Sequence, residues 1–193
     1  MTVGFAMCGS FCTYAQVFPI MELLAKEHRL IPIMSQISCS TDSRFGTAAE
    51  NVGKVTDICG MSPLCTIAEV EPIGPKKLLD ALIIAPCTGN TLAKLAHSIA
   101  DTSVTMATKS HLRNGRPVLV AVSTNDALAG AAENIGRLMG RKNYFFVPFG
   151  QDDSMQKPTS MVADFRMIPD ALAAAMSGKQ LQPREHRGGC GCG

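Results

Sequence analysis

One short loop of the sequence gathers several uncharged hydrogen-bonding groups. Residues 87–91 read Cys-Thr-Gly-Asn-Thr, between an apolar run at 82–85 and a segment whose apolar residues recur at helical spacing. Hydroxyls, an amide and the free N–H groups at a helix start can all donate hydrogen bonds to a phosphate or to a polar ring edge. Such groups bind a ligand without the cost of burying a charge. The loop is therefore a candidate cofactor site, with an elaborate helix cap as the simpler alternative.

Three more polar segments follow apolar runs in the same way, at 8–13, 35–40 and 123–126. The first reads CGSFCT, which is not a GxGxxG motif, although it still places Gly9 and Ser10 before a helical segment. The second contains no Asp or Glu, the residues that usually bind the ribose hydroxyls of NAD. This absence counts against NAD and suits a nucleotide without an adenosine ribose, such as FMN.

The apolar runs alternate with amphipathic segments, which predicts βαβ units and a parallel sheet. We expect an α/β fold: a single-domain, Rossmann-like three-layer sandwich with about six parallel strands, over residues 1–176. The strands are expected at 3–8, 30–34, 80–85, 117–122 and 143–147, with 64–70 as a possible sixth and 161–176 as the last helix. The carboxyl ends of parallel strands share one edge, so the four polar segments should meet there. Residues 177–193 are expected to form a flexible tail containing Gly and Cys.

Composition excludes several classes of protein. The chain has 193 residues, a net charge of +2 and no apolar stretch of membrane-spanning length, which argues against nucleic acid and membrane as partners. The N-terminus lacks the basic region of a signal peptide, so a cytoplasmic location is expected. Six of the eight cysteines lie in or beside apolar segments and are expected to be free, buried thiols: Cys8, Cys12, Cys39, Cys59, Cys65 and Cys87. The tail residues His186, Cys190 and Cys192 are too few for a metal site, and we expect none.

Three segments resemble a known family. They are GSFCT at 9–13, APCTGNTLAKLAHSIAD at 85–101 and PVLVAVSTNDAL at 117–128. Together they resemble the flavoprotein family of FMN-containing cysteine decarboxylases and prenyl-flavin synthases. A further segment, YFFVPFGQDDSMQKPTSMVADF at 144–165, resembles one branch of that family, a component of a synthase from spore-forming bacteria. The resemblance implies an FMN-binding fold, and a role in oxidising a dihydropyridine dicarboxylate in the mother cell of a sporulating bacterium.

Site residues carried over from the resemblance lie in the four polar segments. Those matched to the cofactor are Gly9, Ser10, Ser35, Pro86, Thr88, Gly89, Asn90, Thr91, Ser123 and Thr124. Asn125 and Lys157 are the candidates for binding the dicarboxylate substrate, with Arg44, Lys94, Lys109 and Arg113 as further available cations. No catalytic residue is evident. Asp152 and Asp153 are weak candidates for proton transfer, with helix capping as the alternative role.

The family's decarboxylases use a histidine base that this chain lacks, because no histidine lies between His28 and His97. Three functions remain open. The leading one is an oxidoreductase component that binds FMN and acts with a second, different chain of the same synthase. The second is a non-catalytic partner that shapes or stabilises the complex, and the third is an FMN-dependent decarboxylase. A homo-oligomer is also expected, since a single domain of this size leaves the strand-end crevice open on one side.

Overall fold

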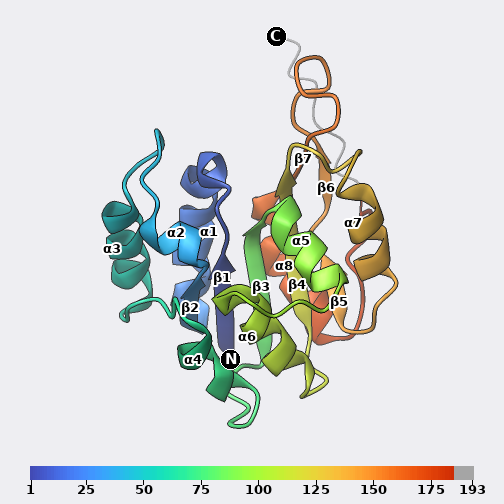
Figure 1. The fold of residues 1–193 in the computed structure, drawn as a ribbon. Helices are drawn as coiled ribbons and strands as arrows, with labels where there is room; N and C mark the ends of the chain where they lie inside the picture. Colours follow the sequence, from blue (N-terminus) through green and yellow to red (C-terminus); the bar gives the residue numbers. More distant parts are fainter. Residues whose placement is uncertain (185–193) are drawn as a thin grey trace.

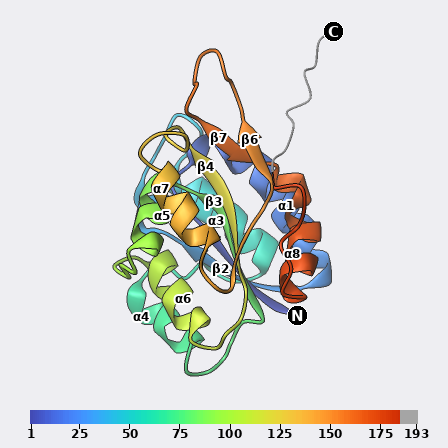
Figure 2. The same ribbon diagram turned by 90° about the vertical axis from the view of Figure 1, so that its right-hand side faces the viewer.

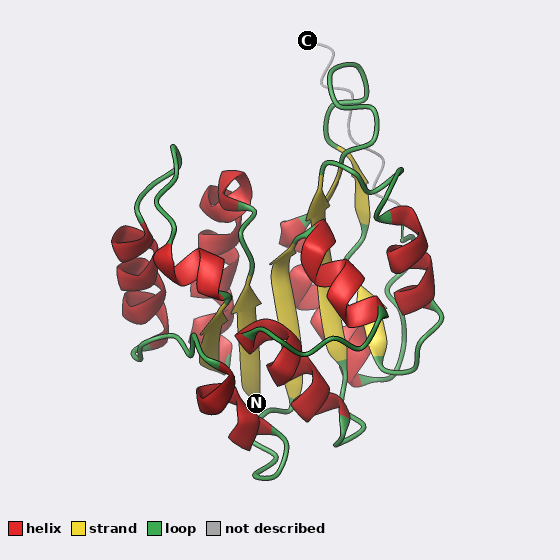
Figure 3. Ribbon diagram, in the orientation of Figure 1, coloured by secondary structure: helices red, strands yellow, loops and turns green. Residues whose placement is uncertain are grey.

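A seven-stranded sheet forms the centre of the molecule in the computed structural model, which describes residues 1–184 (Figures 1 and 3). The strand order is β2-β1-β3-β4-β7-β6, with β5 paired to β4 outside this path. Strands β1 to β5 pair in parallel, whereas β7 pairs antiparallel with both β4 and β6. The strands are β1 (Thr2–Met7), β2 (Arg29–Met34), β3 (Ala81–Cys87), β4 (Val118–Thr124), β5 (Tyr144–Phe146), β6 (Phe149–Gln151) and β7 (Met161–Ala163).

Helices cover both faces of the sheet, which confirms the predicted three-layer α/β fold (Figure 2). Helices α4, α5, α6 and α7 lie on one face, and α1 and α8 lie on the other; α2 and α3 lie at the β2 edge. Their bounds are α1 (Tyr14–Glu27), α2 (Gln36–Ser40), α3 (Ala48–Cys59), α4 (Ile67–Val70), α5 (Gly89–Ala96), α6 (Ser103–Leu112), α7 (Ala132–Met139) and α8 (Ile168–Met176), with 3-10 turns η1 (Phe11–Thr13), η2 (Glu71–Ile73) and η3 (Phe165–Met167).

Burial explains why the strand sequences are apolar throughout rather than alternating. Every residue of β3 is buried, as are the last five residues of β1 and of β2. A sheet covered by helices on both faces has no solvent side, so its strands need no polar positions. The five parallel strands consequently bring their carboxyl ends, and the loops that follow them, to one edge.

The edge of β4 that faces away from β3 pairs with two different strands along its length. Its first residues, Val118 to Val120, pair in parallel with β5, and its last two residues pair antiparallel with β7. Strands β6 and β7 form a hairpin that projects beyond the carboxyl edge (Figure 1). The expected helix over 161–176 was therefore wrong in its first part. Residues 161–163 are a strand, and the helix α8 begins at Ile168 after a 3-10 turn.

The expected strand at 64–70 was also wrong. Leu64 alone bridges to Ile33 of β2, and Ile67–Val70 is the helix α4. Thr66 and Glu69 form a capping box, in which the Glu69 carboxylate accepts the Thr66 N–H at 2.8 Å. Capping boxes start helices, and this local signal outweighed the apolar residues that favoured a strand.

Two of the six cysteines expected to be free are joined in a disulfide, Cys39–Cys65, with Cα atoms 6.6 Å apart. Cys39 lies in α2, directly after β2, and the Leu64 N–H donates to the Pro32 carbonyl of β2 at 2.9 Å. This second contact brings the chain around residue 65 back beside α2. Because this contact joins segments that are far apart in the sequence, the positions of the two cysteines alone could not predict their disulfide. Cys8, Cys12, Cys59 and Cys87 are free, as predicted, but the prediction that they are buried holds for Cys8 and Cys87 and is wrong for Cys12, which is exposed, while Cys59 is half-buried.

The residues directly after α8 are held against the domain. The Gln180 side chain accepts the Phe146 N–H at 2.8 Å and donates to the Phe146 carbonyl at 2.7 Å, so it continues the edge of β5. The Phe149 N–H donates to the Arg184 carbonyl at 3.0 Å. Contacts with the domain therefore continue beyond residue 177, where the flexible tail was predicted to begin. His186, Cys190 and Cys192 lie outside the described residues. No helix among residues 1–184 is long and apolar enough to cross a membrane.

Candidate functional site

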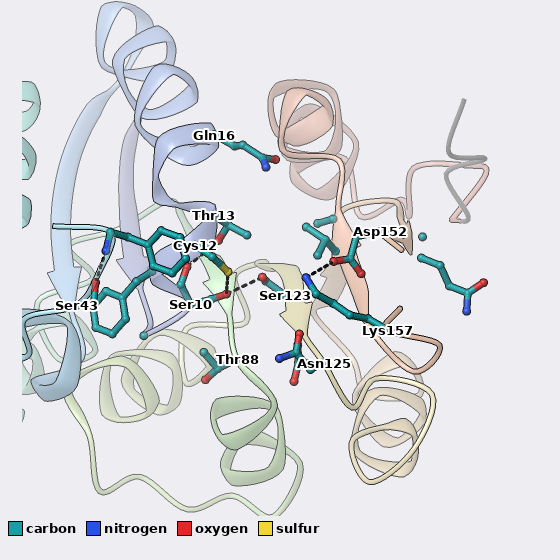
Figure 4. A pocket seen from close by; sticks show the side chains of 18 of the residues that line it. Ser10, Cys12, Thr13, Gln16, Ser43, Thr88, Ser123, Asn125, Asp152 and Lys157 are labelled. Atoms are coloured by element: carbon teal, nitrogen blue, oxygen red, sulfur yellow. Dashed lines mark hydrogen bonds and ion pairs between the residues drawn. The ribbon is translucent and has the colours of Figure 1, made fainter. Parts of the chain in front are cut away.

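Two adjoining cavities open at the carboxyl edge of the sheet. The large edge cavity, of about 680 Å³, lies between the loop after β1, the loop before α3 and the β6–β7 hairpin (Figure 4). The small edge cavity, of about 480 Å³, lies between the ends of β1, β2 and β3 and the start of α5. Gly9 and Thr88 line both cavities. Both volumes fall within the range of about 300–1,000 Å³ that is usual for small-molecule sites.

Two serines join neighbouring loops at the floor of the large edge cavity. Ser10 Oγ lies 2.8 Å from Ser123 Oγ, so the loop after β1 crosses the end of β3 to reach β4 (Figure 4). Gly9 makes this crossing possible, because a Cβ there would lie only 3.1 Å from the Ile37 side chain. One of the two hydroxyl protons makes this bond, and the other remains for Cys12 Sγ, 3.8 Å from Ser10 Oγ, or for a ligand in the cavity.

The start of α5 forms the wall between the two cavities. Thr88 is its N-cap, and the Thr88 hydroxyl accepts the Thr91 N–H at 3.4 Å. The start of α5 lies close to the loop after β4, and Gly89 fits there because it has no Cβ. A Cβ at this position would lie 2.7 Å from Thr124 Oγ1 and 2.8 Å from Asp126 Oδ1. The arrangement leaves Asn90 exposed on the first turn of the helix, with its amide at the small edge cavity.

A pair of buried thiols underlies this wall. Cys8 ends the β1 segment and Cys87 ends β3, and the Thr91 hydroxyl donates to Cys8 Sγ at 3.3 Å. A hydrogen bond from Cys87 and the bond from Thr91 outweigh burial and lower the pKa of the Cys8 thiol. Burial raises the pKa of Cys87 well above its ordinary value. The pair links the ends of adjacent strands beneath the start of α5.

The outer walls of the large edge cavity carry its charges. Arg44 lies on one side, with its guanidinium 4.8 Å from the centre of the Phe45 ring. Lys157 lies on the hairpin side, 3.4 Å from an oxygen of Asp152 (Figure 4). Burial acts to raise the pKa of Asp152, but hydrogen bonds from Ser160 and its own backbone, with the Lys157 charge, lower it overall. Asp152 is consequently an ionised partner of Lys157 at neutral pH.

The structure distributes the predicted site residues over both cavities. Ser10, Ser123, Thr124, Asn125, Asp152 and Lys157 line the large one, and Ser35, Asn90 and Thr91 line the small one. Pro86 lies buried within β3 and follows a cis peptide bond. Asp153 lines neither cavity, because its carboxylate accepts the N–H groups of Met155 and Gln156 and closes the hairpin turn.

Sequence reasoning missed several residues of the large edge cavity, chiefly the pair Phe11 and Phe45 and the thiol of Cys12. Phe45 is 49% exposed and sits on a tight turn in which Ser43 and Gly46 bond to each other's backbone. Gly46 has a φ of +129°, which only glycine adopts without strain. The sequence signal was Ser-Arg-Phe-Gly at 43–46, an exposed aromatic beside a cation in a turn.

Within residues 1–184, no group of three or more His, Cys, Asp or Glu side chains is placed to hold a metal ion. Neither edge cavity is lined by a histidine from the described part of the chain. The two cavities therefore offer uncharged donors at their centre and two cations, Arg44 and Lys157, on opposite outer walls, and the carboxylates that line them, Asp152 and Asp101, are each paired with a lysine. That composition suits an anionic ligand with an extended polar middle.

A parallel sheet with helices on both faces and uncharged donors at its carboxyl edge is the architecture of a nucleotide-binding flavoprotein. The model of the flavoprotein family matches residues 1–174, and the chain belongs to that family.

Two relatives are similar along nearly their whole length. The chain is 46% identical to the B subunit of dipicolinate synthase from Bacillus subtilis (strain 168), over 94% of this chain and 91% of that one. The crystal structure of the B subunit of dipicolinate synthase from Bacillus halodurans matches with a TM-score of 0.88 at 42% identity, covering 96% of each chain. The FMN-dependent cysteine decarboxylase SpaF matches with a TM-score of 0.66 at 20% identity, over 92% of this chain and 95% of that one, which shows a shared fold.

Proposed function

We propose that this chain is the B subunit of a dipicolinate synthase, and that it holds FMN and helps to oxidise dihydrodipicolinate to dipicolinate during sporulation. The observation that carries the proposal is identity of 46% with a relative of that name along nearly the whole of both chains. The edge cavities support it, because they supply the uncharged donors and the outer cations that an anionic cofactor and a dianionic substrate require.

The residues of the two edge cavities fit FMN. The phosphate is proposed to lie in the small edge cavity, where Ser35, Asn90 and the first turn of α5 offer donors. The one carboxylate that lines this cavity among the described residues, Asp101, is paired with Lys94 at 2.8 Å, so it does not oppose an anion with an unbalanced charge. The ribityl chain would pass Thr88 and Ser10 into the large edge cavity. When bound there, a flavin supplies a hydride acceptor.

The substrate is proposed to occupy the outer part of the large edge cavity. Asn125 presents its side chain from the loop after β4, and Lys157 and Arg44 offer positive charge from opposite walls. A dicarboxylate has two negative groups, and two separated cations match that pattern. Asp152 is assigned the positioning of Lys157 rather than proton transfer, because a carboxylate with a lowered pKa is a weak base.

A second chain is proposed to close the large edge cavity. Phe45 is 49% exposed on one rim and Met155 is 90% exposed at the tip of the hairpin. Exposed apolar side chains around a polar cavity are typical of an interaction surface. The A subunit of dipicolinate synthase, and further copies of this chain in a homo-oligomer, are the proposed partners, with residues 150–158 as the meeting segment.

A second candidate function rests on one observation. The large edge cavity is lined by no histidine from residues 1–184, and its carboxylate has a pKa below the ordinary range. A cavity without a group poised near neutral pH favours a non-catalytic partner that shapes the complex while the A subunit carries the chemistry. The same lack of a histidine argues against the third possibility, an FMN-dependent decarboxylase.

One experiment separates these functions. The chain would be purified alone and with the A subunit, its visible spectrum recorded, and FMN titrated into it by fluorescence. Dipicolinate formation from dihydrodipicolinate would then be measured for each chain alone and for the pair. A flavin spectrum with activity in the pair supports the oxidoreductase role. A colourless chain that takes up no FMN, in a pair that is still active, supports the non-catalytic partner.

A further inference from the structure

A third cavity, which we call the side cavity, lies away from the carboxyl edge. It has a volume of about 400 Å³ and lies between the end of α5, the outer face of α6 and the start of β5. Tyr144, which lines it, pairs with Val118 at the start of β4, so this cavity faces the amino end of that strand. None of its lining residues lines either edge cavity. The side cavity is therefore a separate feature.

Apolar side chains form its interior and cations form its rim. Leu95 and Leu112 line the interior. Lys109 lies on α6, and Arg113, the C-cap of that helix, follows one turn later; both are exposed and form no ion pair with any residue between 1 and 184. The lining contains no Asp or Glu from the same described range. The side cavity therefore combines an apolar interior with two unpaired cations at its rim. This combination favours an anion that has an apolar body.

A tyrosine hydroxyl adds a directional group. The Tyr144 side chain lines the cavity, and most of it is buried, but its hydroxyl oxygen stays accessible and bonds to no other residue in the described part of the chain. Burial raises the pKa of Tyr144 to about 12, against the opposing effect of Arg141, so the hydroxyl keeps its proton at neutral pH. A polar group of a buried residue without a protein partner normally bonds to water or to a ligand.

The wall of the side cavity is preformed. The Arg141 guanidinium donates to the Leu95 carbonyl at 3.1 Å, to the Ala96 carbonyl at 2.5 Å and to the Ser98 hydroxyl at 3.3 Å. These bonds add to the Ser98 N–H that the Leu95 carbonyl also accepts, and they fix the end of α5 against the start of β5. A ligand that enters here meets an ordered wall and loses little affinity to reorganisation.

We propose that the side cavity binds a small aromatic carboxylate, with its ring against Leu95 and Leu112 and its carboxylate bound by Lys109, Arg113 and the Tyr144 hydroxyl. Charge complementarity selects the carboxylate, and the apolar interior selects the ring. The volume of about 400 Å³ lies within the range usual for small-molecule sites and admits a single ring. The proposal does not depend on flavin binding or on the synthase activity.

Benzoate is the probe for this site. It would be titrated into the full-length ¹⁵N-labelled protein, and the amide shifts would be mapped onto the structure. Saturable shifts are expected around residues 95–100, 108–113 and 141–144. Acetate, which lacks the ring, and benzamide, which lacks the charge, should each bind about tenfold more weakly. Tyr144→Phe should weaken benzoate binding about tenfold, since it removes a hydrogen bond to a charged group and leaves the ring.

The double variant Lys109→Gln/Arg113→Gln should weaken benzoate binding by tenfold or more. The matched control is Lys26→Gln/Lys142→Gln, which removes the same charge outside the cavity and should leave the affinity unchanged. Shifts that cluster at the carboxyl edge and vanish in Lys157→Gln would overturn the proposal. So would the absence of saturable shifts, or a change of sedimentation in the α6 variant without benzoate binding, which would make this face an interface between copies.

Discussion

The walls of the two edge cavities are formed by different kinds of structural element. The small one is walled by capped helix starts and buried polar contacts: Ser35 caps α2, Thr88 caps α5, and the Cys39–Cys65 disulfide ties α2 to the neighbouring segment. The large one shares that inner wall, but its outer walls are an exposed turn at 43–46 and the tip of the β6–β7 hairpin. Gly9 and Thr88 line both cavities, so they lie at the boundary between the capped inner wall and the exposed outer walls.

This difference matches the proposed division of the edge between two ligands. A cofactor that stays bound gains affinity from donors fixed before it arrives. A substrate that enters and leaves needs walls that can open, and loops on a rigid scaffold provide them. If the division is real, changes in the small cavity will alter stability and cofactor affinity. Changes in the large cavity will alter substrate binding and leave the cofactor unaffected.

The largest expected effect is on stability. Cys39→Ser/Cys65→Ser removes a crosslink spanning 26 residues, which by loop-closure entropy stabilises the fold by about 3 kcal/mol. Denaturant unfolding without reductant should show that loss, and reductant should destabilise the wild-type protein but not the variant. Cys12→Ser, which removes an exposed free thiol, is the control. Equal unfolding midpoints for wild type and double variant would mean that the crosslink does not rigidify this half of the edge.

Cofactor affinity is expected to change next most strongly. Asn90→Leu should weaken FMN binding about tenfold, because it removes an amide donor proposed to reach the phosphate. The melting temperature should be unchanged, since Asn90 is exposed on the first turn of α5. Asn134→Leu on α7 lies outside both cavities and serves as the control in the same fluorescence titration. An unaltered FMN affinity in Asn90→Leu would remove the small cavity from the cofactor site.

Lys157→Ala tests whether the large edge cavity binds the substrate and not the cofactor. The KM for dihydrodipicolinate, measured with the A subunit present, should rise about fivefold, because an exposed cation contributes modestly to binding an anion. FMN affinity should not change. Lys142→Ala removes an equally exposed cation away from the cavity and should leave both quantities alone. A fall in FMN affinity in Lys157→Ala would show that the two cavities are not separate in function.

The smallest effect concerns protonation of Asp152. Its folded-state pKa is lowered, so the ion pair with Lys157 is complete above the ordinary Asp pKa of about 3.9 and is lost only as pH falls through the lower folded value. Substrate binding should therefore show no titration from Asp152 between about pH 5 and 8. Carboxyl NMR of Asp152 should give a midpoint below about 3.9. A midpoint above it would return Asp152 to the list of proton-transfer candidates.

The parallel core could be predicted from sequence because its strands carry a simple signal. Continuous apolar runs, each followed by a polar loop and a helical segment, identify buried parallel strands and the edge at which their loops meet. Ser10, Thr88 and Ser123 were found this way, and each one lines an edge cavity. The reasoning needed only local pattern and the geometry common to all such sheets.

What sequence reasoning missed depends on contacts between distant segments. The β6–β7 hairpin is formed by strands of three residues each, too short for an alternating pattern. Its pairing partner, the end of β4, is fixed only in the folded chain. The Cys39–Cys65 bridge depends on the return of Leu64 to β2, and Arg44 reaches the cavity through a turn that no periodicity marks.

The mode of attachment of the β6–β7 hairpin has an evolutionary consequence. It joins the main sheet through two residue pairs at the end of β4, Ser123 with Val162 and Thr124 with Met161. Substitutions or insertions between residues 152 and 160 would alter the outer wall without displacing a buried strand or a helix cap. The hairpin tip is thus a segment in which selection can change the outer wall of the large edge cavity while the parallel core stays intact. A lineage could acquire a new reaction here by altering a few positions of one turn.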